Sequence, residues 1–285
     1  MDGNLSFDAP AAAKAAGELP AHKYTRERIT WIRRWTDHLF SFRLTRDRGY
    51  RFVPGQFARL GLYRDDVHGE RRGPRYVWRA YSIASADYDE HLEFYSIVVP
   101  EGDFTTRLAQ LRIGDQLLIE KQAYGFLTLD RFEGGRDLWL LSSGTGIAPF
   151  VSILLDLKAW ERYERLIVVH SVRHASELAY RDTIEGLRAH EVFGEALADN
   201  PARLVYVPIV TRERIDGCLH ARIPALLGNS SLEAAAGVTL DPQRSRVMIC
   251  GNPDMVDDIR RHLSNAGYAV SRRGQPAQMA VENYW

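Results

Sequence analysis

The stretch LWLLSSGTGIAPFVSIL, residues 138–154, decides how the second half of this chain folds. A run of large apolar residues stops at a Ser-Ser pair, and the apolar residues after the turn return with helical spacing. This change predicts a buried strand, a tight turn and a helix with Pro149 in its first turn, where a missing N–H costs no hydrogen bond. Such turns lie at the carboxyl ends of parallel strands, where phosphates bind. A phosphate site and a tight connection without a ligand are both compatible with the three turn residues, Gly144, Thr145 and Gly146.

Composition limits the class of protein. The length of 285 residues suggests about two domains, at roughly 150 residues each. Lys plus Arg and Asp plus Glu balance at 37 each, so no overall charge favours nucleic acid or an anionic membrane. No apolar run approaches the roughly 18 to 20 residues that span a bilayer. We therefore expect a cytoplasmic protein with no nucleic-acid or membrane partner.

Only two cysteines occur, Cys218 and Cys250, which excludes a disulfide framework and an iron-sulfur cluster held by four thiolates. His170 and His174 have a spacing compatible with zinc, but no third ligand is evident, so we expect no metal site. Residues 1–22 lack a charged segment followed by an apolar core, which argues against a secretory signal, and we expect a flexible tail there.

The pattern of apolar residues differs between the two halves of the chain. Residues 23–134 contain short alternating runs such as FSFRLT and LEFYSIVV between turn signals, which predict an antiparallel barrel or sandwich with one helix at 104–111. Residues 135–285 contain two-sided apolar runs such as RLIVVHS and RVMIC, mostly followed by helical stretches, which predict a parallel, Rossmann-like α/β domain. The charged insert at 64–75 carries no motif and is expected to be a loop.

Further candidates follow other predicted strands. In ICGNPDMV, Cys250, Gly251 and Asn252 fall at a strand end, although an isolated Cys250 is more often only a small buried side chain. In RAYSIAS, Arg79, Tyr81 and Ser82 could grip a phosphate, cover a flat ring and hydrogen-bond to it, or simply form an edge strand with a surface arginine.

Two more segments contain candidate site residues. In EGDFTTRL, Gly102 precedes Thr105 and Thr106, which could cap a helix or cradle a phosphate. The chain ends in AVENYW, and two large aromatic residues, Tyr284 and Trp285, would be a liability unless they are docked.

In this order, the motifs RAYS, GTGIAPF, VTRE, CGNPDM and VENYW resemble those of the bacterial ferredoxin-NADP reductases, which also accept flavodoxin, and the resemblance extends from Tyr24 to Trp285. It implies a barrel that binds FAD and a following domain that binds NADP(H). It also implies ferredoxin or flavodoxin as the electron-transfer partner, docked on a basic surface of the barrel half, and we expect a monomer. The alternative is the reductase component of an oxygenase or an NAD(P)H:flavin reductase, which share this plan. A third interpretation is a noncatalytic binding module. Loss of RAYS or Cys250 would have favoured it, but both are present.

Matching residue by residue, the resemblance implies that Arg79 contacts the FAD pyrophosphate, Tyr81 covers one face of the isoalloxazine and Ser82 hydrogen-bonds near flavin N5. Gly102 and Thr105 would approach the pyrophosphate, with Thr106 nearby.

For NADP(H), the resemblance implies that the turn around Thr145 lies near the pyrophosphate. Cys250 and Glu282 match positions near the nicotinamide, next to Gly251 and Asn252. Tyr284 matches the aromatic residue on the other flavin face, where it would act as a gate that moves aside on each turnover, and Trp285 resembles a terminal ring that can lie against the adenine of FAD.

Preference for NADP over NAD requires cations for the 2′-phosphate. Arg173, Arg212 and Arg222 follow predicted strands or precede a helix at positions where the family carries such cations. A single surface arginine is usually only a solvated charge, but three in one domain favour NADP.

Overall fold

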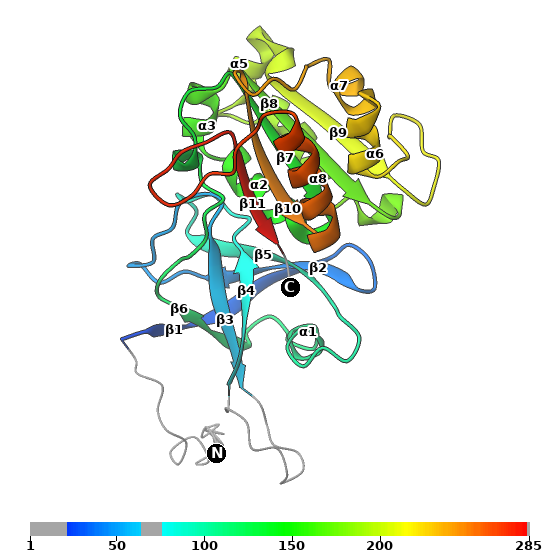
Figure 1. Cartoon of the computed structure of the whole chain (residues 1–285). Coiled ribbons are helices and arrows are strands. Elements are labelled where there is room, and N and C mark those ends of the chain that lie inside the picture. Colours follow the sequence, from blue (N-terminus) through cyan, green and yellow to red (C-terminus); the bar gives the residue numbers. More distant parts are fainter. Residues whose placement is uncertain (1–21, 64–75, 284–285) are drawn as a thin grey trace, which may run out of the picture.

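A computed structural model of the chain describes residues 22–63 and 76–283. Most of the predicted tail, the insert at 64–75, and Tyr284 and Trp285 with their proposed gate all lie outside these ranges. Two sheets organise the described residues, one antiparallel and one parallel (Figure 1). The antiparallel half comes first along the chain and the parallel half second, as the two hydrophobic patterns of the sequence predict.

The first sheet is antiparallel and has six strands in the order β4-β3-β6-β1-β2-β5. These strands are β1 (Tyr24–Arg34), β2 (Leu39–Thr45), β3 (Phe57–Tyr63), β4 (Tyr76–Ser82), β5 (His91–Ile97) and β6 (Gln116–Glu120). A bridge between Ile83 and Phe94 links the two edges, so the sheet curls towards a barrel. Its interior is filled by apolar side chains such as Phe42 and Leu60, which alternate with outward-facing residues along each strand.

Helix α1 (Thr105–Leu108) is shorter than the predicted helix at 104–111. Its N-cap is Phe104, without a side-chain hydrogen bond, so the predicted threonine cap is wrong. Thr105 Oγ1 instead accepts from the N–H of Val99 at 3.0 Å, and Thr106 Oγ1 donates to the carbonyl of Gly102 at 2.7 Å. Because the side chains of both threonines bond to the preceding loop, they fix its shape rather than cap the helix.

The second sheet is parallel, in the order β11-β10-β7-β8-β9. Its strands are β7 (Asp137–Ser143), β8 (Arg165–Val172), β9 (Leu204–Val210), β10 (Ser245–Gly251) and β11 (Met279–Asn283). Four of them were predicted from their apolar runs. Strand β11 was not predicted. Its five residues do not alternate clearly between apolar and polar side chains, and because it lies at an edge of the sheet it lacks the continuous apolar run of a central strand. It ends beside the six-stranded sheet (Figure 1).

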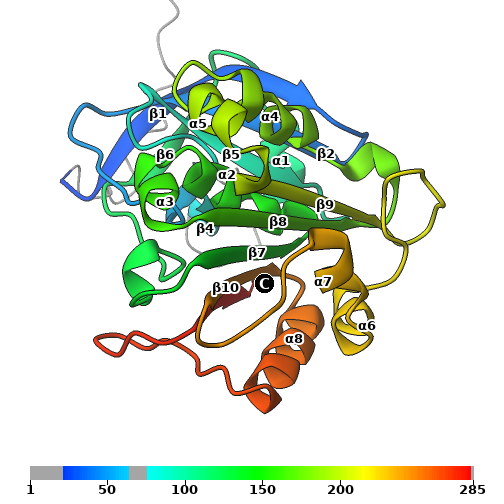
Figure 2. The same ribbon diagram turned by 90° about the horizontal axis from the view of Figure 1, so that it is seen from above.

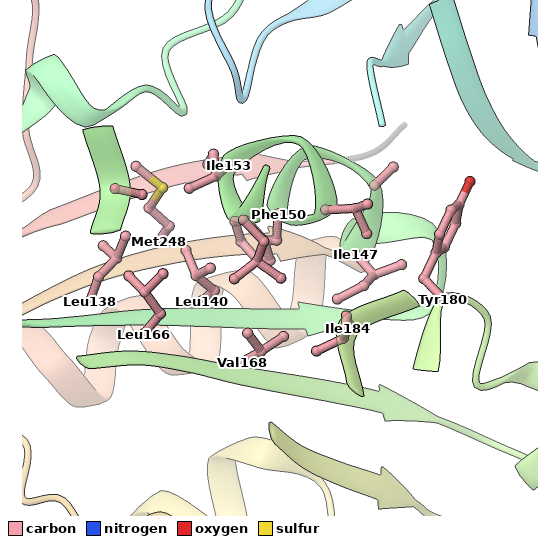
Figure 3. Packing of buried hydrophobic residues seen from close by; sticks show 14 of the residues in the cluster. Leu138, Leu140, Ile147, Phe150, Ile153, Leu166, Val168, Tyr180, Ile184 and Met248 are labelled. Atoms are coloured by element: carbon pink, nitrogen blue, oxygen red, sulfur yellow. The ribbon is translucent and has the colours of Figure 1, made fainter. Parts of the chain in front are cut away.

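Helices cover both faces of this sheet (Figure 2). On one side are α2 (Ala148–Leu154), α3 (Leu157–Arg162), α4 (Arg181–Gly186) and α5 (Gly194–Asp199); on the other are α6 (Ile223–Gly228), α7 (Ser231–Ala236) and α8 (Pro253–Asn265). The two-sided apolar runs explain this arrangement. Leu138 and Leu140 pack in the first layer (Figure 3), while Trp139 and Leu141 pack in the second.

Helix α2 begins beside the glycine turn, as predicted, with Pro149 in its first turn. The helical spacing after the turn continues to Ala159 and predicts one helix, but the structure has two, because the side chain of Asp156 accepts from the N–H of Lys158 and caps a new helix, α3.

Tyr180 joins the two halves. Its backbone is left-handed at φ 62°, and its side chain is buried. The hydroxyl donates to Glu93 Oε1 of β5 at 2.9 Å and lies 2.7 Å from Ser41 Oγ of β2. The ring contacts Trp35 and Tyr95 at centroid distances of 5.3 and 5.5 Å. A residue of the parallel half thus provides a buried donor to a carboxylate of the antiparallel half.

We expect Tyr180→Phe to lower the free energy of unfolding by about 1 to 3 kcal/mol, because it keeps the ring but removes a hydrogen-bond donor from a buried carboxylate. Urea denaturation measures this loss. Tyr88→Phe is the matched control, since the Tyr88 side chain is exposed and its change should stay within about 0.5 kcal/mol. Equal stability of the two variants would show that the buried hydroxyl contributes nothing.

Candidate functional site

Two cavities lie where the halves meet. The first, of about 550 Å³, opens between β4, β5 and α1 and is closed by residues at the end of β11. The second, of about 510 Å³, lies at the carboxyl ends of β7, β8, β9 and β10. Ile97 and Thr145 line both, so the cavities adjoin at these two residues.

Three predicted residues of β4 line the first cavity: Arg79, Tyr81 and Ser82. The Tyr81 ring is held by Phe104 at a centroid distance of 5.6 Å, and its hydroxyl lies 3.0 Å from Ser96 Oγ. Burial raises the pKa of Tyr81 to about 12, partly offset by the Ser96 hydrogen bond, so the ring stays neutral. The Arg79 side chain is exposed, which leaves its charge at the mouth of the cavity.

Gly102 and Thr105 form another wall of the first cavity. A Cβ atom added to Gly102 would lie 2.9 Å from Thr105 Oγ1 and 3.0 Å from the carbonyl of Val99. Only glycine fits between these atoms without movement, so the packing of this loop requires glycine at position 102. Thr106 is not part of the lining but holds the Gly102 carbonyl.

Glu282 of β11 faces the first cavity from the other half of the chain. Burial raises its pKa to about 7, although the backbone N–H of Phe126 counteracts part of the shift. Glu282 is paired in register with Cys250 of β10. The Cys250 side chain is fully buried and is not part of either cavity's lining among the described residues. Of these two predicted residues, only Glu282 can reach a ligand in this arrangement.

The glycine turn borders the second cavity. Gly144, at φ 53°, and Thr145 line it, whereas Gly146 is buried beneath them. A Cβ on Gly146 would lie 2.3 Å from the carbonyl oxygen of Cys250, so the turn packs directly on the end of β10. This close approach, rather than a strained dihedral, explains why the third turn residue is glycine.

The end of β10 forms the adjacent wall. Gly251, at φ 140°, and Asn252 both line the second cavity. The N–H of Asn252 donates to Ser143 Oγ at 3.0 Å, and its side chain accepts from the N–H of Met255 at 3.2 Å, which caps α8. Oδ1 of Asn252 is thus engaged with the helix, and both N–H groups of its side-chain amide can serve a ligand.

All three predicted arginines line the second cavity: Arg173, Arg212 and Arg222. The N–H of Arg212 donates to the carbonyl of Arg173 at 2.9 Å, which ties the loops after β8 and β9 together. Within residues 22–63 and 76–283, neither Arg212 nor Arg222 forms an ion pair. Two carboxylates of α8, Asp254 and Asp258, also lie in the lining. Cations free to pair favour an anionic ligand at the arginine end.

The sequence did not reveal the roles of two buried residues. Glu177 lines the second cavity and pairs with Arg173, at 2.9 Å between Oε1 and Nη2. His170, considered above only as a metal ligand, lies beneath the glycine turn with Nε2 3.1 Å from the carbonyl of Gly144. Burial lowers the pKa of His170 to about 4, so the ring is neutral and donates from Nε2. The sequence contains only weak indications of these roles: Glu177 lies four residues after Arg173, and His170 lies near the end of a predicted strand.

The chain resembles known proteins in both sequence and fold. Residues 140–261 match the model of the oxidoreductase NAD-binding domain family. The chain is 42% identical over 259 residues to a ferredoxin-NADP reductase of Pseudomonas aeruginosa, covering 90% of this chain and 95% of the relative. It is 35% identical to a flavodoxin/ferredoxin-NADP reductase of Escherichia coli, with coverage of 90% and 97%.

Among solved structures, the chain resembles a ferredoxin NADP+ reductase of Neisseria gonorrhoeae with bound FAD and NADP. The TM-score is 0.82 at 37% sequence identity, and the match covers 92% of this chain and 99% of the other. No helix among the described residues is long and apolar enough to cross a membrane. Identity above about a third over nine-tenths of the sequence, together with the shared two-sheet fold, places the chain in the ferredoxin-NADP reductase family.

Proposed function

We propose that this chain transfers hydride between NADP(H) and FAD, and single electrons between FAD and a ferredoxin or flavodoxin. FAD, when bound, supplies this chemistry because a flavin exchanges two electrons with a nicotinamide and one at a time with a protein carrier. The observation that supports the proposal is the junction of the two cavities at Ile97 and Thr145, where rings bound in each could face one another. The family of the chain supports the same conclusion.

The first cavity fits FAD. Arg79 provides the cation for its pyrophosphate, and Gly102 and Thr105 line the cavity, with Thr105 and Thr106 holding the loop. Tyr81 would support one face of the isoalloxazine, since its hydroxyl is engaged with Ser96 and its ring is fixed. Ser82 would hydrogen-bond near flavin N5.

The second cavity fits NADP(H). Its glycine turn and the end of β10, Gly144 to Gly146 with Gly251 and Asn252, would lie along the pyrophosphate and nicotinamide. The arginines at the far end would bind the 2′-phosphate, because a guanidinium forms paired, charge-assisted hydrogen bonds with phosphate oxygens. Cys250, buried behind Gly251, would shape the nicotinamide site through the backbone rather than by contact.

Glu282 is the candidate proton carrier. Its pKa of about 7, caused by burial, allows its carboxyl to hold or release a proton near neutral pH beside the place where the rings would meet. The proposed division of labour is a FAD-binding domain at 23–134 and an NADP-binding domain at 135–285, with Tyr284 and Trp285 as an aromatic lid.

An anaerobic titration of the purified protein, followed by flavin absorbance, tests the proposal. We expect NADPH to bleach the flavin at far lower concentration than NADH. Arg222→Ala should raise the NADPH concentration required by roughly tenfold or more, since a hydrogen bond to a charged group contributes about 1.5 to 3 kcal/mol, and should leave NADH unaffected. Arg260→Ala is the control, because Arg260 lies on α8 outside both cavities.

Equal bleaching by NADPH and NADH would contradict the NADP assignment and favour a reductase component of an oxygenase. A colourless protein that cannot take up FAD would contradict the proposal as a whole and favour a binding module.

A further inference from the structure

Glu177 is a buried carboxylate in a cavity that is otherwise suited to an anion. It ends a short 3₁₀ turn, Ala175–Glu177, just after β8, and only 6% of its surface is exposed. Its side chain lines the second cavity together with Arg173 and Arg212. An unpaired carboxylate there would repel a phosphate group, so its place in the lining requires an explanation.

The hydrogen bonds of Glu177 provide one. Oε1 accepts from Arg173 Nη2 at 2.9 Å, and Oε2 accepts from the backbone N–H groups of Arg173 at 2.9 Å and His174 at 3.4 Å. One carboxylate therefore holds both the backbone and the guanidinium of Arg173. Burial by itself would raise the pKa of Glu177, but the hydrogen bonds from Arg173 and its charge lower the pKa below its ordinary value, so the group is ionised.

The pairing leaves part of the guanidinium available. Nη2 of Arg173 is engaged with Glu177, while no described residue accepts a hydrogen bond from Nε or Nη1. About half of the Arg173 side chain is exposed, at 48%, so without Glu177 it could sample many rotamers. Fixing a long side chain before a ligand arrives removes its ordering cost from binding.

Glu177 is itself anchored. The N–H groups that it accepts belong to the start of the turn, and His38 Nε2 of the antiparallel half lies 3.6 Å from its Oε1. On the other side, the carbonyl of Arg173 accepts from the N–H of Arg212. The carboxylate is therefore a fixed point between the barrel and the two arginine-bearing loops.

We propose that Glu177 is a positioning residue that holds Arg173 with its free N–H groups directed at the 2′-phosphate of NADP(H), and thereby sets the preference for NADPH over NADH. This inference rests on the proposed function. According to this inference, a negatively charged residue strengthens the binding of an anion. Removal of the Glu177 charge should then weaken binding, whereas simple repulsion between the carboxylate and the phosphate predicts that binding becomes tighter.

The test measures binding of adenosine 2′,5′-bisphosphate, a probe without a nicotinamide, to the FAD-loaded protein by isothermal titration calorimetry. We expect Glu177→Gln to raise Kd about tenfold, and Arg173→Ala to raise it at least as much. The double variant should bind no more weakly than Arg173→Ala, because Glu177 acts only through Arg173.

Steady-state kinetics supply a second readout. Glu177→Gln should raise KM for NADPH about tenfold while KM for NADH and both kcat values stay near those of the parent, a selective change that general damage to the fold would not produce. Glu185→Gln is the matched control: Glu185 pairs with Arg181 at the same four-residue spacing and the same 2.9 Å, but it is exposed and is not in the lining of either cavity.

Tighter binding of the probe by Glu177→Gln would overturn the inference, because it would mean that the carboxylate mainly repels the phosphate. An equal loss of affinity from Glu177→Gln in the presence and absence of Arg173 would also overturn it, because Glu177 would then act independently of that arginine. If Glu177→Gln does not fold, Glu177→Asp, which keeps the charge but shortens the reach, provides the same comparison. Failure of the parent protein to bind the probe would overturn the proposed function and this inference with it, whereas parent binding that Glu177→Gln leaves unchanged overturns this inference alone.

Discussion

Gly146→Ala should destabilise the protein by about 3 kcal/mol and weaken NADP+ binding by at least tenfold. The new Cβ would lie 2.3 Å from the carbonyl oxygen of Cys250 and 2.9 Å from the Cα of Gly251, which are backbone atoms that cannot turn away. Overpacking of a tight core costs about 1 to 3 kcal/mol, and a backbone clash belongs at the upper end. Relief requires the turn to move off β10, which displaces Thr145 from the junction of the two cavities.

Gly144→Ala is the control within the same turn. Nothing lies within 4 Å of a Cβ at Gly144, so the substitution meets only the left-handed conformation, φ 53°, at a cost of roughly 1 to 2 kcal/mol. Urea denaturation and calorimetric titration with NADP+ measure both variants. If Gly144→Ala proved the more harmful, dihedral strain and not the contact with β10 would determine the turn.

Glu282 and His170 should give the stability of the protein opposite pH dependences that largely cancel. The pKa of Glu282 is raised from 4.5 to about 7 by burial, so between these values the folded state holds a proton that the unfolded state has lost, and stability falls as pH rises. The pKa of His170 is lowered from 6.5 to about 4 by burial. Between those values the unfolded state holds the extra proton, and stability rises with pH.

Single substitutions should reveal each component. At about 1.4 kcal/mol per pKa unit, each group contributes roughly 3 kcal/mol between pH 4.5 and 6.5. Relative to the parent, Glu282→Gln should therefore lose about 3 kcal/mol of stability on acidification from pH 6.5 to 4.5, whereas His170→Gln, whose amide can still donate to Gly144, should gain a similar amount. Urea denaturation at both pH values measures this. Parallel pH profiles for the parent and both variants would show that neither group is shifted in the folded protein.

Part of the fold could be predicted from short-range patterns. The apolar runs predicted four of the five parallel strands, and Pro149 marked the start of α2. Both features can be recognised from neighbouring residues, because a strand buried on two faces needs consecutive apolar side chains and proline has a fixed φ. The helices were less well predicted. Asp156 interrupts an apolar stretch whose period continues on both sides, and the threonines of α1 bond backward to the loop instead of capping the helix.

For the site, the motifs and the family resemblance indicated residues that line the two cavities, but not the residues that hold them in place. Arg79 and Tyr81 line the first cavity, and the three arginines at 173, 212 and 222 line the second. Cys250 does not, because its position at the end of β10 turns its side chain into the core.

The sequence by itself determined most strands of the two sheets, though not β11, and which side chains can meet phosphates and a flat ring, because strand period, turn chemistry and side-chain charge are properties of neighbouring residues. Only the tertiary structure decided what holds those side chains in place. Tyr180 meets Glu93 across 87 residues of chain, and His170 supports Gly144 across 26. Contacts over such separations arise when the sheets pack, since burial selects the partner of each polar group only after the surrounding surfaces have come together.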